Sequence, residues 1–455
     1  MKRLVLTALA LLAGCAGPRP TAPLDTAVTA PSAWLQPVAQ GGAIDAQWWK
    51  TFGDPALDQL VEKALRHNPD LAIAAQRVQE SAALLQQSHA ATQPSVDGVI
   101  GAARQRAVSA TGRGLTQTGK QAQLSLSYEL DLFGRLASAD AAARAALQGN
   151  EAARDALRLS IAASVSEAYL GLCTLAARER LLNATLEARA SARQLVQRRA
   201  DAGYTAPLDA WQAEAEYQGA ARLIPGMRLA MARQQDALSV LLGEAPHAFI
   251  CKTDPLALQL PAVPPVLPAE LLRQRPDIAQ AEQAVVAADH ALDVSRAAFM
   301  PRIQLSAARG FADADVLPMP VQTFSWGGSV LYPIFEGGRL RAQADAAAAR
   351  RDQAAYAYRK AALNAFREVE DALAAVSLGA EQEAADERQK TALEHTLTLA
   401  TRRYKAGYSP YLEQLDAQRQ LFAAQLAAVQ SRAERLSAQV ALYKALGGGW
   451  QGASR

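Results

Sequence analysis

The chain has 455 residues, of which 50% are apolar, only 6% are aromatic and 20% are charged. Lys and Arg number 47 against 44 Asp and Glu, and this net charge of +3 is too small for a protein that binds nucleic acid along a basic surface. Three cysteines and five scattered histidines form no cluster typical of a metal centre or a disulfide framework. The composition therefore predicts closely packed helices, no cofactor, no bound metal and no nucleic-acid partner.

The first 14 residues have the pattern of an export signal. Two basic residues precede an apolar run, Leu4 to Leu12, that is too short to span a bilayer. The run ends in Leu12-Ala13-Gly14-Cys15, which resembles the lipobox of bacterial lipoproteins, whose cysteine is acylated with a fatty acid such as palmitate. We predict a signal peptide at 1–14 and an acylated tether, rich in Pro, Thr and Ala, at 15–47. An ordinary signal peptide without acylation is the alternative.

The destination of the exported chain is predicted to be the outer membrane. Ala16 rather than Asp follows the cysteine, and by analogy with bacterial lipoproteins this implies outer-membrane sorting. No later stretch contains 18 consecutive apolar residues, so we expect no transmembrane helix. A segment that spans the membrane would then have to belong to a β-barrel, because only helices and closed barrels satisfy every backbone group in lipid.

Matching segments in the same order indicate a tandem duplication. Asn68-Pro69-Asp70-Leu71-Ala72 recurs as Arg275-Pro276-Asp277-Ile278-Ala279, and 11 of the 29 positions aligned from this pair onward are identical. Ala202-Gly203-Tyr204 recurs in the same way as Ala406-Gly407-Tyr408. We therefore predict a first structural repeat at 48–253, a Pro-rich joint at 254–268, a second repeat at 269–448 and a C-terminal tail at 449–455.

Each repeat is predicted to contain one pair of strands, at about 95–133 and 302–335. The four strands expected are Ser95–Val108, Gln121–Phe133, Arg302–Gly310 and Gln322–Phe335. Apolar and polar residues alternate along them with period two, so each strand has one apolar and one polar side. We expect loops at 111–120 and 312–320, where Gly, Thr, Asp and Pro gather. The aromatic residues on the apolar side either belong to an interfacial belt or fill wall positions: Tyr128, Trp326 and Tyr332.

After the strands, each repeat is predicted to become one very long helix, Arg135–Ala202 and Arg339–Ala406. At 1.5 Å per residue such a helix measures roughly 100 Å. Apolar residues recur every seven residues in the first helix and form an imperfect coiled-coil seam, which is interrupted at Glu179 and Arg189. A glycine turn then returns the chain as a helix of about 37 residues. The pattern predicts antiparallel helical columns with a strand pair at one end and a tight turn at the other.

Taken together, these features resemble the TolC-like outer-membrane channels of tripartite efflux pumps, and most closely the lipoprotein subfamily that serves resistance-nodulation-division pumps. The most specific segment is Arg403-Tyr404-Lys405-Ala406-Gly407-Tyr408-Ser409-Pro410-Tyr411-Leu412-Glu413-Gln414-Leu415-Asp416-Ala417-Gln418-Arg419. The resemblance implies a mixed α and β membrane protein in which a homotrimer closes a 12-stranded outer-membrane barrel, continued by a periplasmic helical barrel. It also implies a periplasmic adaptor, an inner-membrane pump and outer-membrane lipid as partners.

The resemblance also implies roles for residues near the two glycine turns. It places a periplasmic gate at Asp209, Tyr404, Glu413 and Asp416, and adaptor contacts at Gly203, Tyr204, Gly407 and Tyr408. A possible Tyr404–Asp209 link would help to hold the gate closed. From the residues alone, helix capping explains the acidic positions and the glycines equally well. Leu208 and Ser409 depart from the family pattern. The resemblance therefore does not tell which contacts hold the gate closed.

The predicted function is a passive exit duct for small molecules such as drugs, without catalysis of its own. A coiled-coil envelope lipoprotein without a pore is the main alternative, and metal efflux or protein secretion would use the same channel design. We find no arrangement of nucleophile and base that would indicate an enzyme. Cys173 falls in the long helix and Cys251 near the joint, and these different surroundings favour two unpaired thiols over a disulfide.

Overall fold

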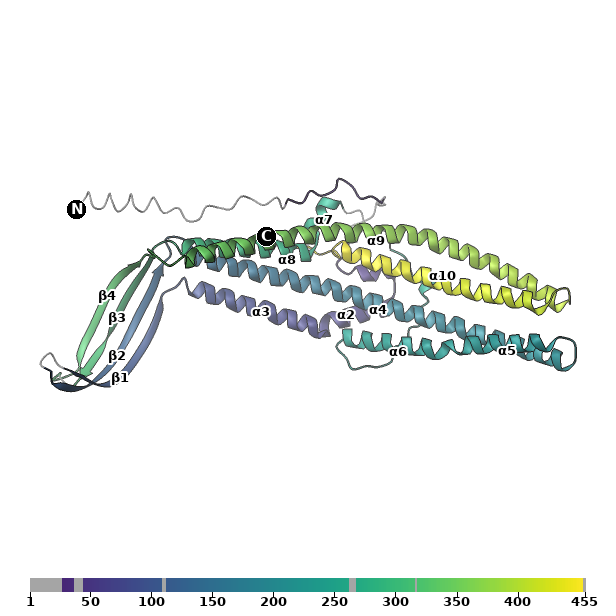
Figure 1. Ribbon diagram of the computed structural model, residues 1–455, viewed down its shortest axis with the longest axis horizontal. Coiled ribbons are helices and arrows are strands. Elements are labelled where there is room, and N and C mark those ends of the chain that lie inside the picture. Colours follow the sequence, from purple (N-terminus) through teal and green to yellow (C-terminus); the bar gives the residue numbers. More distant parts are fainter. Residues whose placement is uncertain (1–26, 37–43, 109–111, 262–266, 316, 453–455) are drawn as a thin grey trace. The chain divides into compact units, whose positions relative to one another are not determined.

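Figure 1 shows the computed structural model of the chain, which describes residues 27–36, 44–108, 112–261, 267–315 and 317–452. Cys15, the predicted signal peptide and most of the predicted tether lie outside the described residues. The chain forms two compact units. We call 76–152 with 279–360 the sheet unit, and 28–75 with 153–278 and 361–455 the core unit.

The helices and strands follow the order predicted for two repeats. The first repeat contains η1 (Trp48–Phe52), α2 (Pro55–His67), α3 (Pro69–Ala90), β1 (Ser95–Val108), β2 (Gly114–Leu130), α4 (Arg135–Asp201), α5 (Pro207–Ala221) and α6 (Leu223–Leu241). After η2 (Pro255–Ala257), the second contains α7 (Pro268–Gln274), α8 (Pro276–Ala297), β3 (Arg302–Ala314), β4 (Val321–Leu331), α9 (Arg339–Lys405) and α10 (Tyr411–Ala445). The strands begin directly after Pro94 and Pro301, because proline lacks the N–H that would continue the preceding helix.

The sheet unit contains one antiparallel sheet of four strands in the order β1-β2-β3-β4. Several predicted boundaries are wrong: β2 and β4 end at Leu130 and Leu331, before the predicted Phe133 and Phe335, because the chain there turns into the start of the next helix. The loop expected at 111–120 is largely strand, because β2 begins at Gly114 and pairs Thr116 with Arg106. The loop expected at 312–320 likewise starts later, since β3 continues to Ala314. Hydrogen bonds to a neighbouring strand hold these polar, Gly-containing segments extended in spite of their low strand propensity.

The two longest helices confirm the predicted lengths to within one residue. α4 and α9 each contain 67 residues, and each ends at one of the predicted glycine turns. Among the described residues, α4 is the one helix with a stretch long and apolar enough to cross a membrane by length and composition alone. Of that stretch 67% is buried inside the structure, so its side chains are those of a protein core.

The core unit is held together by a large apolar cluster around the middle of α4. Val165 and Leu172 on α4 are at most 1% exposed, and they belong to the same cluster as residues of α2, α6 and α10. The Trp48 ring stacks on Tyr443 of α10, with ring centroids 5.4 Å apart. The returning helix of the first repeat is split at Arg222 into α5 and α6, whereas α10 is continuous. Pro225 explains the split, because it has no N–H to donate to the carbonyl of residue 221.

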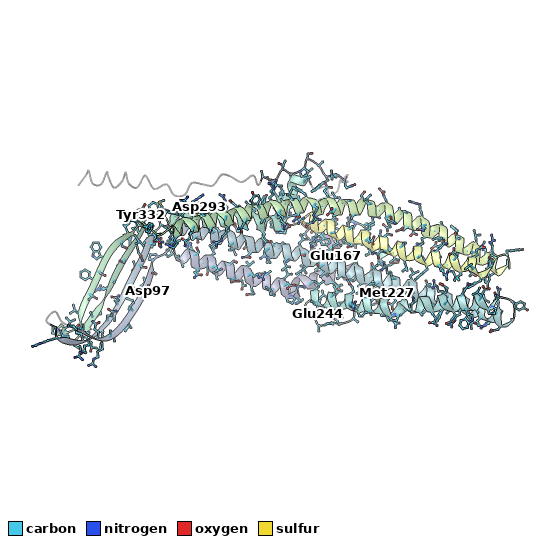
Figure 2. All side chains as sticks on the ribbon, in the orientation of Figure 1. Asp97, Glu167, Met227, Glu244, Asp293 and Tyr332 are labelled. Atoms are coloured by element: carbon cyan, nitrogen blue, oxygen red, sulfur yellow. A yellow bond between two sulfur atoms is a disulfide. The ribbon has the colours of Figure 1, made fainter. Side chains whose placement is uncertain are left out.

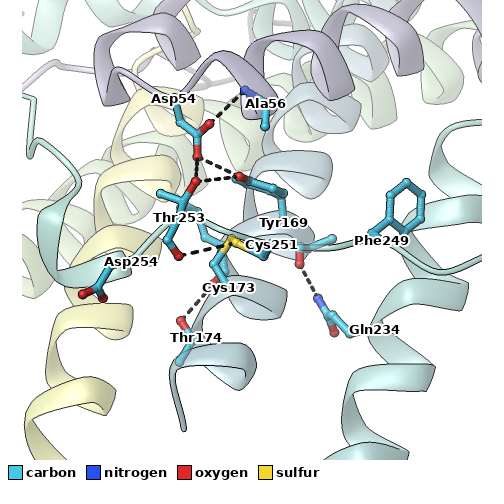
Figure 3. Close-up of a disulfide and its surroundings, with 12 residues drawn as sticks. Asp54, Ala56, Tyr169, Cys173, Thr174, Gln234, Phe249, Cys251, Thr253 and Asp254 are labelled. Atoms are coloured by element: carbon cyan, nitrogen blue, oxygen red, sulfur yellow. Dashed lines mark hydrogen bonds between the residues drawn. A yellow bond between two sulfur atoms is a disulfide. The ribbon is translucent and has the colours of Figure 1, made fainter. Parts of the chain in front are cut away.

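Cys173 and Cys251 form a disulfide, which corrects the expectation of two unpaired thiols (Figure 3). The segment after α6 runs back over α4, so the two Cα atoms lie 5.2 Å apart although 78 residues separate them in sequence. Thr253, two residues further on, donates its hydroxyl to the Asp54 carboxylate at 2.7 Å, and the Tyr169 hydroxyl donates to the same oxygen at 2.7 Å. Burial raises the pKa of Tyr169 and keeps its hydroxyl a donor.

Candidate functional site

The sheet has two chemically different faces, as the alternation predicted. In the ladder Leu126 pairs with Val96 and Ala307, whereas the next residue, Ser127, pairs with Ser95 and Ser306. We call the first side the apolar sheet face, and its large exposed side chains include Val96, Ile100, Leu124, Leu126, Leu305, Phe311, Phe324, Trp326 and Val330. The polar sheet face carries Asp97, Ser125, Ser127, Glu129, Gln304, Ser306, Ser325 and Ser329. Figure 2 shows the position of Asp97 on β1.

The exposure of the apolar sheet face is unusual for a protein in water. Trp326 is 83% exposed and Phe324 is 80% exposed, and both lie on β4 at one edge of the sheet. The outer edges of β1 and β4, strands of 14 and 11 residues, pair with no other strand that the structure describes. Exposed apolar surface of this extent marks contact with lipid or protein, and long free edges pair with strands of another chain.

The two glycine turns of the core unit have the same backbone geometry. Gly203 and Gly407 have φ of 75° and 78°, in the left-handed region that glycine adopts without strain. Tyr204 donates its N–H to Arg199 O at 2.8 Å, and Tyr408 donates to Arg403 O at 2.9 Å. These bonds are those of a Schellman cap, which satisfies the last carbonyls of α4 and α9. Both following tyrosines point outward, with exposed fractions of 84% and 80%.

The two acidic residues predicted to line the gate lie exposed in the first turns of α10. Glu413 forms an ion pair with Arg403 across the turn, and the distance from Arg403 Nε to Glu413 Oε1 is 3.1 Å. Asp416 accepts a hydrogen bond from Gln420, one helical turn further on, at 2.6 Å. The structure thus places both carboxylates on α10 close to the turn, with one of them already held by a basic neighbour.

The predicted Tyr404–Asp209 link is absent from the structure. Tyr404 is only 8% exposed, and its ring packs 5.5 Å from the ring of Tyr411, but its hydroxyl has no hydrogen-bond partner among the described residues. The Asp209 carboxylate instead accepts the hydroxyl hydrogen of Thr205 in its own turn. A side-chain hydrogen bond within its own turn therefore holds Asp209, and no side chain caps the start of α5.

The pKa of Tyr411, beside the second turn, is raised to about 12. Burial of its hydroxyl is the largest cause, and the neighbouring Tyr404 adds to the rise. Tyr404, Tyr411 and Leu415 form an apolar cluster with Val196 of α4 and with two small residues of α5, Ala210 and Ala213. This cluster fastens the α9–α10 turn to the α4–α5 turn within one chain.

Sequence reasoning missed a partly buried ion-pair network between the two helical hairpins. Arg189, whose side chain is 10% exposed, pairs with Glu216 of α5 at 3.1 Å and lies 5.5 Å from the Phe422 ring of α10. Arg419 of α10 binds the same Glu216 carboxylate. The interruption of the heptad seam at Arg189 was the available signal, because a charge inside a seam needs a partner.

Comparison with known proteins identifies the family. The family model described as outer membrane efflux protein matches residues 60–244 and again 267–448. The chain belongs to the outer membrane efflux protein family. The pyoverdine export outer membrane protein OpmQ of Pseudomonas aeruginosa is 35% identical, over 99% of this chain and 98% of that protein. The solvent efflux pump outer membrane protein SrpC of Pseudomonas putida is 34% identical over the same shares.

Solved structures agree with this membership. The outer-membrane channel OprN superposes with a TM-score of 0.88 at 30% identity, covering 96% of this chain and 99% of that one. The Campylobacter jejuni channel CmeC, at 23% identity and a TM-score of 0.86 over 96% of each chain, shares the fold. This outer membrane efflux protein is accordingly a channel subunit of an efflux pump, located in the outer membrane with its helical part in the periplasm. Its family is one of transport proteins and not of enzymes.

Proposed function

We propose that three copies of this chain close their sheets into one 12-stranded barrel and continue it as a helical tunnel. The observation that carries the proposal is the pair of sheet faces together with the two free sheet edges. Joining β4 of one copy to β1 of the next would satisfy the edge hydrogen bonds, which lipid cannot do. The apolar sheet face would then meet lipid and the polar sheet face would line water. The family resemblance supplies the number three.

Charge substitutions on neighbouring residues of β2 test the orientation of the barrel wall. Leu126 lies on the apolar sheet face and Ser127 on the polar sheet face, at almost the same height. Leu126→Arg should destabilise the barrel by about 2 to 4 kcal/mol, and Ser127→Arg by much less. The measurement is urea-induced unfolding in lipid vesicles, with native mass spectrometry to count subunits. Equal losses of stability in the two variants would contradict the proposed orientation. A separate measurement, conductance in planar bilayers, distinguishes a channel from a lipoprotein without a pore.

We assign the second-repeat carboxylates to the narrow periplasmic end of the tunnel. Threefold symmetry would bring six carboxylates, from Glu413 and Asp416 of each copy, to one ring, where they attract cations. The family resemblance supports this position, as does the exposure of both side chains. Glu413→Ala combined with Asp416→Ala should lower cation selectivity, measured as the reversal potential of the purified channel in asymmetric KCl. An unchanged reversal potential would show that these residues only cap a helix.

We assign the two turns to contact with a periplasmic adaptor that joins the channel to an inner-membrane pump. Tyr204 and Tyr408, beside Gly203 and Gly407, present large exposed rings that no described residue covers. Tyrosine is a frequent anchor in protein interfaces because its ring is apolar and its hydroxyl is polar. Tyr204→Ser with Tyr408→Ser should weaken adaptor capture without changing conductance. Full retention of the adaptor would exclude these side chains as contacts.

We infer that the two repeats arose by tandem duplication, with boundaries at 48–253 and 269–448. The family model matches the chain twice, which supports this. Matching contacts also support it: Asn68 donates its amide to Leu241 O, and Arg275 donates its guanidinium to Ala445 O, both at 2.9 Å. We further propose that Cys15 carries the lipid anchor, and Cys15→Ser should then abolish incorporation of labelled palmitate.

The names of the relatives state which molecules those proteins export, and this is the basis for proposing what the present chain transports. These names include pyoverdine export, solvent efflux and antibiotic efflux, at 34 to 36% identity. We propose that this chain conducts small organic molecules delivered by its pump, which selects among them. Susceptibility of a strain that lacks the chain, measured against a panel of such molecules with and without the cloned gene, tests this proposal.

A further inference from the structure

Three arginines from three different elements line one hollow of the sheet unit. Arg135 begins α4, Arg302 begins β3, and Arg350 lies on α9 about three turns after its start. The hollow has a volume of about 420 Å³ and is completed by residues of α8 and by Gln343. The concentration of guanidinium groups is unexpected in a chain with a net charge of only +3.

Among the described residues, one of the three arginines has an acidic partner. Arg135 makes a bidentate ion pair with Glu129, with distances of 2.9 and 2.8 Å from Nη2 to the two carboxylate oxygens. Arg302 and Arg350 form no hydrogen bond or ion pair with any residue that the structure describes. Two positive charges therefore face the hollow without a counter-charge.

Three acidic side chains near the hollow already have basic partners, whereas Asp345, next to Ala346 of the lining, has none among the described residues. Asp293 of α8, labelled in Figure 2, pairs with Arg296 at 3.1 Å. Asp289 lies 3.9 Å from Arg351, and Glu336 pairs with Arg339 at 2.8 Å. Because these carboxylates are engaged, the two free guanidinium groups are available to an anion from outside the chain.

The hollow lies on the polar side of the sheet. Glu129 pairs with Gln304 in the β2–β3 ladder, so both side chains lie on the polar sheet face. Arg302 precedes Gln304 by two residues and shares that face. Arg135 is drawn to the same side through its bond to Glu129. The apolar partners Tyr128 and Leu305 occupy the opposite face.

We propose that this arginine hollow binds an anionic group, a carboxylate or a phosphate, of molecules that pass through the channel. Guanidinium groups form paired, charge-assisted hydrogen bonds with such groups, and two of them in one hollow favour a multivalent anion. The inference rests on the proposed barrel, in which the polar sheet face lines the water-filled interior. A lipid headgroup has the same phosphate chemistry, but it would have to reach the side opposite the apolar sheet face.

The experiment measures block of the channel by citrate, a small trivalent anion. The full chain is purified as its oligomer and inserted into planar bilayers of phosphatidylcholine, and KCl current is recorded as citrate is added. Wild type should show saturable block. Arg302→Gln with Arg350→Gln should raise the half-blocking concentration by about tenfold or more, because two charge-assisted contacts are lost.

Arg341→Gln is the matched control. Arg341 is also exposed and has no partner among the described residues, but it precedes Arg350 by nine residues and lies on the opposite side of α9. Its substitution should leave citrate block unchanged. Arg302→Lys with Arg350→Lys retains the charge and should restore part of the block, which a purely structural role of the arginines would not predict.

Several outcomes would overturn the inference. Equal block in wild type and the double Gln variant would exclude the hollow as the binding site. Loss of wild-type block when phosphatidylglycerol is added to the bilayer would identify a lipid headgroup as the occupant. Normal conductance without citrate block would refute the anion site alone, whereas absence of conductance in every protein would refute the proposed channel.

Discussion

The two glycine turns share one backbone and differ in what covers them. After Gly407, Tyr411 and Leu415 are 2% and 1% exposed and pack into the apolar cluster between the hairpins. The positions 204 residues earlier hold Pro207, which is exposed, and Trp211, which is 73% exposed. At these duplicated positions the side chain is therefore buried in the second repeat and exposed in the first.

The backbone of a repeat and its side-chain surface are therefore under separate constraints. A Schellman cap needs only a glycine after the helix, so both turns keep it. In the proposed trimer each hairpin would have neighbours on two sides, whereas within one chain only one side is covered. The hollow of about 460 Å³ beside Trp211 lies on the uncovered side of the first hairpin.

The largest expected effect comes from truncating the buried and the exposed member of the same duplicated position. Leu415→Ala should destabilise the α9–α10 turn by about 2 to 5 kcal/mol, because it leaves a cavity in the cluster. Trp211→Ala should change local stability by less than about 0.5 kcal/mol. Hydrogen exchange of each turn, followed by mass spectrometry, measures both effects. Equal acceleration in the two turns would mean that a neighbouring copy covers Trp211.

A smaller effect concerns alkaline pH and the buried Tyr411. Its pKa is raised to about 12, so between pH 10 and pH 12 the unfolded chain loses this proton while the folded chain keeps it. Stability should therefore be constant with respect to this group below pH 10 and fall as the pH rises toward 12, by about 2 kcal/mol.

Tyr411→Phe isolates that contribution. The variant should show a shallower loss of stability than wild type between pH 10 and pH 12, while the two proteins keep a constant difference between pH 7 and pH 9. Thermal unfolding followed by circular dichroism at each pH provides the measurement. Parallel curves over the whole range would show that Tyr411 does not titrate differently in the folded chain.

The smallest effect tests whether the two caps are equivalent. Gly203→Ala and Gly407→Ala each place a Cβ in open space, since no atom lies within 4 Å of the built position, but φ remains positive. Each should cost about 1 to 2 kcal/mol, from the left-handed conformation alone. The fraying of α4 and α9, again by hydrogen exchange, compares them. A clearly larger effect at one turn would reveal a difference in backbone constraint that the structure does not show.

The regular features of the chain were predictable from its sequence because they repeat. Period-two alternation gave both faces of the sheet, and the glycine after each long helix gave its end to within one residue. The strand ends at Gly114 and Ala314 were missed, because their composition favours a loop and only the adjacent strand keeps them extended. The ion pair between Arg135 and Glu129 was also not predicted, because it depends on how the start of a helix lies beside a strand.

Local sequence determined the elements that the structure describes: strand pairs, long helices, helix caps and the acidic positions after Gly407. Physical rules that act over a few residues suffice for these features, namely side-chain periodicity, the fixed φ of proline and the freedom of glycine. Tertiary structure decided which distant groups meet. The segment after α6 folds back to bring Cys251 to Cys173, Asp209 bonds to Thr205 instead of reaching Tyr404, and Arg302 and Arg350 converge. Such long-range contacts depend on the path of the whole chain, which a local sequence pattern does not predict.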